Sequence, residues 1–93
     1  MSQPAQEQQP ITVYTTDWCA YCIRAKHLLD KRGYAYREIN VQGDHDRRAW
    51  LVKVTGQRTV PQIFVGDTSI GGYREIADLD RRGELERLVF SRA

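Results

Sequence analysis

Cys19 and Cys22 are the two cysteines of the 93-residue chain, and they stand three positions apart in the run Trp18-Cys19-Ala20-Tyr21-Cys22. Two thiols at this spacing can exchange reversibly with a disulfide or contribute to a metal site. A zinc site needs four ligands, and the two histidines, His27 and His45, do not have finger-like spacing from the cysteines. The pair therefore indicates redox chemistry, and we predict no metal site.

A strand followed by a helix is expected to position the two thiols. The β-branched and aromatic residues 11–15 predict a strand. Apolar residues recur at helical spacing over residues 20–31. Thr16 or Asp17 is expected to cap this helix, and Gly33 to end it.

Cys19 lies at the predicted start of that helix, and this position determines its chemistry. The first amides of a helix have no intrahelical partner and carry partial positive charge, so a thiolate is stabilised there. We therefore expect a lowered pKa for Cys19, which makes it the attacking thiol. Cys22 lies one turn deeper and less exposed, so its predicted role is to attack a mixed disulfide formed at Cys19.

The rest of the chain predicts five further elements. They are a strand over 34–41, a helix from Asp44 or Asp46 to about Val54, hairpin strands over 61–65 and 68–70, and a helical stretch over 74–90 that Gly83 bends or splits. The order β-α-β-α-β-β-α predicts an α/β fold, a single four-stranded mixed sheet flanked by three helices. The first two strands are expected to be parallel.

Thr59-Val60-Pro61 precedes the first hairpin strand. Proline cannot donate to a sheet ladder, and an X–Pro bond adopts the cis form at small cost. A cis bond would turn the Val60 amide and carbonyl outward beside Cys19, where an extended thiol substrate could pair with them like an added strand. The alternative is an ordinary trans proline that marks the start of the strand.

Gly71-Gly72 precedes the last helical stretch and is a second candidate binding segment. Two glycines let a ligand approach the backbone closely, and the helix start offers free amides to a carboxylate. The alternative is a simple turn from strand to helix.

The composition excludes several classes of protein. Hydrophobic residues make up 41% of the chain and charged residues 28%, with a formal net charge of +2, so no basic stripe for nucleic acid is present. No apolar run reaches the length of about 18 residues that a membrane span needs. Residues 1–10 are polar and do not resemble a signal peptide, so we predict a disordered tail, a domain over 11–93, and a monomeric, cytoplasmic protein.

Taken together, the motifs resemble the glutaredoxin family, over residues 11–90. The resemblance is carried by Tyr14-Thr15, Cys19-Ala20-Tyr21-Cys22, Arg24-Ala25-Lys26, Thr59-Val60-Pro61-Gln62-Ile63-Phe64, Ile70-Gly71-Gly72 and Leu79-Asp80-Arg81-Arg82-Gly83-Glu84-Leu85. It implies the thioredoxin fold and the small bacterial three-helix dithiol type.

The resemblance also implies a reaction. Glutathione would be the cosubstrate, with no bound cofactor, and glutathionylated or disulfide-containing proteins would be the partners. By the family pattern, Cys19 takes the glutathione from a mixed disulfide, and free glutathione then releases it. Cys22 resolves the intermediate formed with a protein disulfide.

The family pattern further implies a set of glutathione-binding residues: Tyr21, Arg58, Thr59, Val60, Pro61, Gly72, Tyr73, Arg74 and Glu75. Thr59 and Val60 would hold the cysteinyl backbone. Residues 72–75 would surround the γ-glutamyl end, and Tyr21 would flank the sulfur.

The charged positions depart from the family pattern. Thr16 stands where many members carry a lysine that meets the glycyl carboxylate, so Gln57 or Arg58 is expected there, and Arg58 is the better charge match. Arg74 and Glu75 stand where many members carry two acidic residues, so one charge is reversed.

Two departures at the active site keep other functions open. Ala20 replaces the usual proline, and some members without that proline share an iron–sulfur cluster between two subunits, so a dimeric cluster carrier is one alternative. Thr15-Thr16-Asp17-Trp18-Cys19 is similar to the mycoredoxins, which use mycothiol, and Trp18 is also similar to thioredoxins. The reductant could therefore be mycothiol or thioredoxin reductase.

Overall fold

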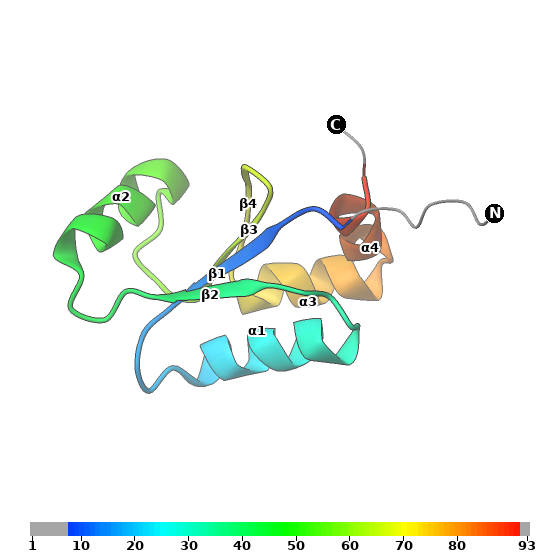
Figure 1. The fold of residues 1–93 in the computed structure, drawn as a ribbon, viewed down its shortest axis with the longest axis horizontal. Helices are drawn as coiled ribbons and strands as arrows, with labels where there is room; N and C mark the ends of the chain where they lie inside the picture. Colours follow the sequence, from blue (N-terminus) through cyan, green and yellow to red (C-terminus); the bar gives the residue numbers. More distant parts are fainter. Residues whose placement is uncertain (1–7, 92–93) are drawn as a thin grey trace.

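The sheet of this protein has four strands in the order β2-β1-β3-β4 in the computed structural model, which describes residues 8–91 (Figure 1). The elements are β1 (Ile11–Thr15), α1 (Ala20–Lys31), β2 (Arg37–Asn40), α2 (His45–Thr55), β3 (Gln62–Val65), β4 (Thr68–Gly71), α3 (Tyr73–Arg81) and α4 (Glu84–Val89). β1 pairs parallel with β2 and antiparallel with β3, and β3 and β4 form a hairpin. The predicted mixed sheet is confirmed.

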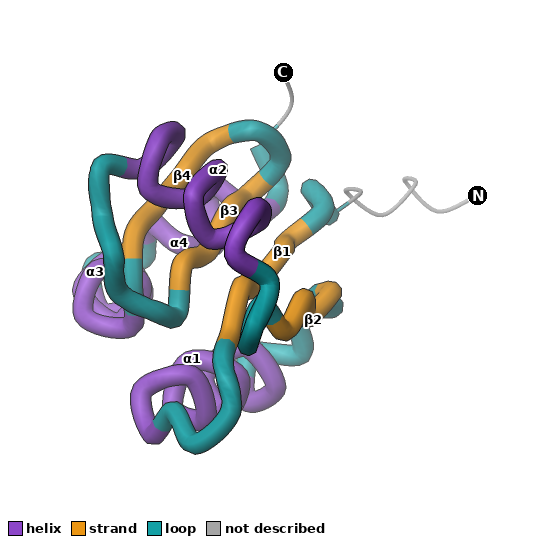
Figure 2. Tube along the Cα trace, turned by 90° about the vertical axis from the view of Figure 1, so that its left-hand side faces the viewer, coloured by secondary structure: helices purple, strands orange, loops and turns teal. Residues whose placement is uncertain are grey.

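Helices cover the two faces of the sheet unequally. α1 and α3 lie on one side of the strands and α2 on the other (Figures 1 and 2). Val13 and Ile63, fully buried, belong to the large core that the first face forms with α1, α3 and α4. Tyr14 alternates to the other face, where it packs with Leu51 of α2 in a smaller core. Because strand side chains alternate, one strand supplies both cores.

The element boundaries correct two predicted details, the N-cap of α1 and the length of β2, and they agree with the predicted division at Gly83. The N-cap of α1 is Cys19 itself, not Thr16 or Asp17. The stretch predicted over 74–90 is divided at Gly83, whose φ of 73° lies in the left-handed region, so α3 and α4 are separate helices. β2 is shorter than the predicted strand over 34–41.

Residues 8–10 run along the domain. The Gln9 amide donates to the Val89 carbonyl at 2.7 Å, and the Gln8 side chain donates to the Ala35 carbonyl at 2.6 Å. The rest of the segment predicted as a tail, residues 1–7, lies outside the described residues. Within residues 8–91, every helix is too short or too polar to cross a membrane.

Candidate active site

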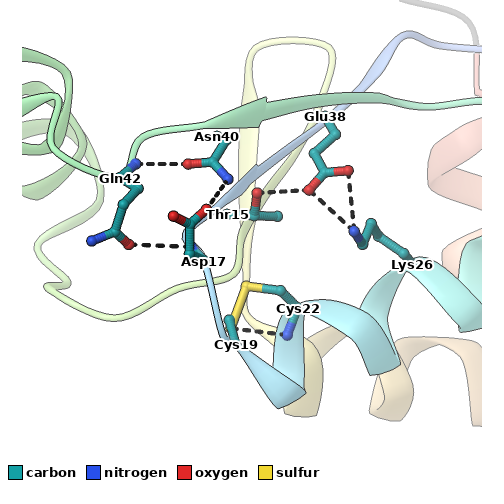
Figure 3. A network of polar contacts seen from close by, with 8 residues as sticks. All are labelled: Thr15, Asp17, Cys19, Cys22, Lys26, Glu38, Asn40 and Gln42. Atoms are coloured by element: carbon teal, nitrogen blue, oxygen red, sulfur yellow. Dashed lines mark hydrogen bonds and ion pairs between the residues drawn. A yellow bond between two sulfur atoms is a disulfide. The ribbon is translucent and has the colours of Figure 1, made fainter.

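Cys19 and Cys22 are joined by a disulfide, with their Cα atoms 5.2 Å apart (Figure 3). The Cys22 N–H donates to Cys19 Sγ at 3.0 Å, so a sulfur stands where a helix usually has a capping oxygen. After reduction, a thiolate at Cys19 would face the positive end of the helix dipole and this N–H donor. Cys19 is half-buried, whereas Cys22 is 2% exposed, so an incoming group reaches Cys19 first.

The turn before Cys19 holds Trp18 in an unusual conformation. Its φ is 58°, in the left-handed region, and its side chain is fully exposed. Side chains from the end of β2 and from the segment after it hold this turn. The Asp17 N–H donates to Gln42 Oε1 at 3.2 Å, and Asn40 Nδ2 donates to Asp17 Oδ1 at 2.9 Å. The Gln42 N–H donates to Asn40 Oδ1 at 2.8 Å, which closes the network (Figure 3).

A second polar group lies between β1, β2 and α1. The Thr15 hydroxyl donates to Glu38 Oε2 at 2.8 Å, and Lys26 Nζ reaches both Glu38 oxygens at 3.1 Å (Figure 3). The hydrogen bond from Thr15 and the Lys26 ammonium lower the pKa of Glu38 against the opposing effect of partial burial. The charge of Lys26 is therefore compensated by Glu38.

Val60 lies beside the sulfur on the opposite side of the turn. The Val60–Pro61 bond is cis, which is one of the two alternatives expected from the sequence. Cys19 Sγ lies 3.7 Å from the Val60 carbonyl oxygen, within reach of a weak hydrogen bond from a protonated thiol. A backbone acceptor from the loop before β3 is thus adjacent to the N-terminus of α1.

A cleft of about 290 Å³ brings together residues far apart in the sequence. It is lined by Tyr21, Gln57, Thr59, Val60, Pro61, Gly72, Tyr73, Arg74 and Glu75. These are the predicted substrate-binding residues, with one exchange: Gln57 lines the cleft and Arg58 does not. The rings of Tyr21 and Tyr73 stack with centroids 6.1 Å apart and form one wall.

The two charged residues of this cleft are in different situations. Glu75 Oε1 accepts a hydrogen bond from the Gly72 N–H at 2.7 Å, so the carboxylate caps the start of α3. Arg74 is exposed. At Gly72, a Cβ atom would lie 3.2 Å from the Pro61 carbonyl oxygen, so glycine allows the two cleft segments to approach closely.

Comparison with known proteins now decides the family. The glutaredoxin family model matches residues 11–70. The chain belongs to the glutaredoxin family. A glutaredoxin of Pseudomonas aeruginosa is 45% identical over 80 residues, which cover 86% of this chain and 95% of that relative. Glutaredoxin 3 of Escherichia coli is 39% identical over 79 residues, covering 85% and 95%.

Solved glutaredoxin structures agree with this fold. A buckwheat glutaredoxin–glutathione complex superposes with a TM-score of 0.80 at 37% identity, covering 87% of this chain and 76% of that one. The solution structure of a Brucella melitensis glutaredoxin has a TM-score of 0.84 at 32% identity, covering 95% and 96%. The thioredoxin fold is confirmed, and the protein is a thiol–disulfide oxidoreductase.

Sequence reasoning missed the network that holds the turn of this glutaredoxin. Asp17, Asn40 and Gln42 are ordinary polar residues in the sequence. Their contacts span 23 and 25 positions, so no local pattern could reveal them. Charge alone favours Arg58 over Gln57 as the partner of the glycyl carboxylate, but Gln57 lines the cleft and Arg58 does not.

Proposed function

We propose that this glutaredoxin uses glutathione to reduce protein–glutathione mixed disulfides and protein disulfides. The supporting observation is the cleft that Val60 forms with the start of α3, because the Val60 carbonyl oxygen of this cleft lies 3.7 Å from Cys19 Sγ. A cysteinyl tripeptide has a backbone, two carboxylates and one ammonium group to bind. The cleft offers backbone groups next to the sulfur and charged groups at its rim.

The first reaction needs Cys19 alone. Its thiolate attacks the glutathione sulfur of the mixed disulfide, and the protein sulfur leaves as a thiolate, which takes up a proton. A glutathione thiolate then attacks the glutathione sulfur bound to Cys19, forming oxidised glutathione and restoring the Cys19 thiolate. The N-cap position supports both steps, because the helix amides stabilise Cys19 as nucleophile and as leaving group.

Reduction of a protein disulfide adds Cys22. After Cys19 has formed a mixed disulfide with the substrate, the Cys22 thiolate attacks Cys19 Sγ and releases the reduced substrate. The product is the Cys19–Cys22 disulfide, which two glutathione molecules then reduce. Burial of Cys22 supports this assignment, since a shielded thiol reacts with a neighbouring sulfur before it meets an external one.

Glutathione is proposed to bind by backbone pairing and by charge. The backbone of Thr59 and Val60 would pair with the cysteinyl residue of glutathione. That residue would lie between Cys19 Sγ on one side and the stacked rings of Tyr21 and Tyr73 on the other. The amides at the start of α3 and the guanidinium of Arg74 would bind the γ-glutamyl carboxylate. Gln57 would donate to the glycyl carboxylate.

Reduction of a glutathionylated peptide, coupled to glutathione and glutathione reductase, tests the proposal. The parent and Cys22→Ser should both turn over. Cys22→Ser should fail with a protein disulfide that the parent reduces. If Cys22→Ser were inactive on both substrates, the step through Cys19 alone would be wrong.

Mycothiol is the second candidate reductant, and the fully exposed Trp18 beside Cys19 favours testing it. If neither variant turns over with glutathione while Cys19 still reacts with an alkylating agent, mycothiol and thioredoxin reductase should replace glutathione in the assay. Visible absorption after anaerobic reconstitution tests the iron–sulfur alternative. A monomer in the cytoplasm remains part of the proposal.

A further inference from the structure

Gln62, the first residue of β3, is a polar side chain in an apolar place. It is 1% exposed, and the other buried polar side chain among residues 8–91 is Thr15. Its Oε1 atom accepts no hydrogen bond from the described residues. A buried amide with an unpaired acceptor costs stability relative to an apolar residue of the same size, so its retention needs another reason.

The paired half of the Gln62 amide holds the loop before it. Nε2 donates to the Thr59 carbonyl oxygen at 2.9 Å and lies 3.4 Å from the Thr59 hydroxyl. The opposite orientation of the amide would set two acceptors against each other, so the carbonyl of Thr59 determines which end is the donor. Gln62 itself does not line the cleft, whereas Thr59 and Val60 do.

Holding the Thr59 carbonyl also fixes the amide of Val60. The Thr59–Val60 peptide is trans and planar, so its C=O and its N–H point in opposite directions. Because the carbonyl is directed at the buried Gln62 amide, the Val60 N–H is directed away from the interior. None of the hydrogen bonds within residues 8–91 uses this N–H, and the carbonyl of the same residue lies 3.7 Å from Cys19 Sγ.

We propose that Gln62 is a positioning residue for the thiol substrate. Its amide locks the Thr59–Val60 peptide so that the Val60 N–H is presented to the substrate backbone next to Cys19. This inference rests on the proposed function only for the identity of the thiol, glutathione. Preorganising a donor lowers the cost of ordering it when substrate binds, so the effect of Gln62 is on affinity and not on sulfur chemistry.

Gln62→Met keeps the volume and removes the donor. We expect about a tenfold rise in the KM for glutathione, the value of one lost hydrogen bond, with kcat within about twofold of the parent. The rate of Cys19 alkylation by iodoacetamide should not change, since that reagent needs no backbone pairing. The urea midpoint should stay the same or rise, because the unpaired acceptor is removed.

Thr15→Val is the matched control, since it removes the other buried polar group without touching the cleft. It should lower the urea midpoint and leave the KM unchanged. A parental KM in Gln62→Met, or an equal rise of KM in Thr15→Val, would overturn the proposal.

Gln62→Glu supplies a second test, which can still be carried out if Gln62→Met does not fold. An ionised carboxylate cannot donate to the Thr59 carbonyl, but a protonated one can, and burial raises the pKa of a carboxyl. The KM relative to the parent should therefore fall as the pH is lowered from about 8 to about 5.5. A ratio independent of pH would contradict the role assigned to the donor.

A measurement without substrate separates this inference from the proposed function. If the parent does not use glutathione, the proposed function fails, and the nuclear magnetic resonance shifts of the Thr59 carbonyl carbon and the Val60 amide nitrogen decide the role of Gln62. Both should move in Gln62→Met and stay in place in Thr15→Val. Unmoved shifts in Gln62→Met would show that the amide does not hold this peptide.

Discussion

The turn that carries Cys19 has two flanks with opposite organisation. The anchored flank consists of Thr15, Asp17, Lys26, Glu38, Asn40 and Gln42, whose polar groups bond to one another at 2.8 to 3.2 Å. The open flank consists of Gln57, residues 59–61 and residues 72–75, which line the cleft with Tyr21. Within the described residues, the Val60 N–H of the open flank has no partner, while the Asp17 N–H of the anchored flank is bonded.

This difference shows how a small domain can hold a reactive sulfur and still admit a substrate. Groups that are already paired keep the turn in place and offer little to a ligand. Unpaired groups on a rigid loop offer hydrogen bonds that are realised when the substrate arrives. Changes on the two flanks should therefore have different signatures: substrate affinity on the open flank, and stability on the anchored flank.

Removing the Cys19 sulfur, which lies between the two flanks, has the largest expected effect. Cys19→Ser should lower the rate of peptide deglutathionylation about a thousandfold or more, because a hydroxyl is a far weaker nucleophile than a thiolate. The coupled glutathione reductase assay measures this, with Cys22→Ser as the matched control that keeps its activity. Substantial activity in Cys19→Ser would place the nucleophile elsewhere.

A charge reversal on the open flank should act on affinity. Arg74→Asp is expected to raise the KM for glutathione about tenfold, since a charge-assisted hydrogen bond to the γ-glutamyl carboxylate is replaced by repulsion. Arg87→Asp makes the same change in net charge on α4, away from the residues of the cleft, and should leave the KM unaltered. A lower KM in Arg74→Asp would mean that this position faces the ammonium group instead.

Breaking the anchored flank should have a smaller effect, and this effect should be on stability more than on substrate affinity. Asn40→Ala removes the bridge between Asp17 and Gln42, and we expect a loss of about 1 kcal/mol in the free energy of unfolding. The KM should change less than in Arg74→Asp. Urea unfolding and steady-state kinetics on the same preparation measure both. A rise in KM matching that of Arg74→Asp would show that the two flanks are not independent.

The smallest expected effect is a pH dependence on the anchored flank. The pKa of Glu38 is lowered from 4.5 in the folded protein, chiefly by Thr15 and then by Lys26. Its stabilisation is therefore complete above the unfolded pKa of about 4.5 and is lost as the pH falls through the lower folded value.

Glu38→Gln should accordingly be less stable than the parent near neutral pH by less than about 1 kcal/mol, because the pair is partly exposed. The difference should shrink towards acid pH. Urea unfolding of both proteins at about pH 7 and about pH 3 measures it. A difference that grows towards acid pH would have the wrong sign for a lowered pKa.

The sequence by itself determined the parts of this protein that local patterns encode. Alternation and helical spacing predicted the order of strands and helices, and the glycine at position 83 predicted the division of the last helix. The cysteine spacing at a strand–helix junction predicted the redox site. These features depend on residues within a few positions of one another, so their physical causes can be read along the chain.

Only the tertiary structure decided which polar groups are bonded and which are left for a substrate. Cys19 is the N-cap of α1, and the Glu75 carboxylate accepts a hydrogen bond from the Gly72 N–H. Gln57, and not Arg58, lines the cleft. Gln62 entered the interior to hold the Thr59 carbonyl. Three of these contacts, those of Cys19, Glu75 and Gln62, join residues three positions apart, so the sequence makes them possible. Packing of the sheet against its helices decides which of the possible donors and acceptors are used.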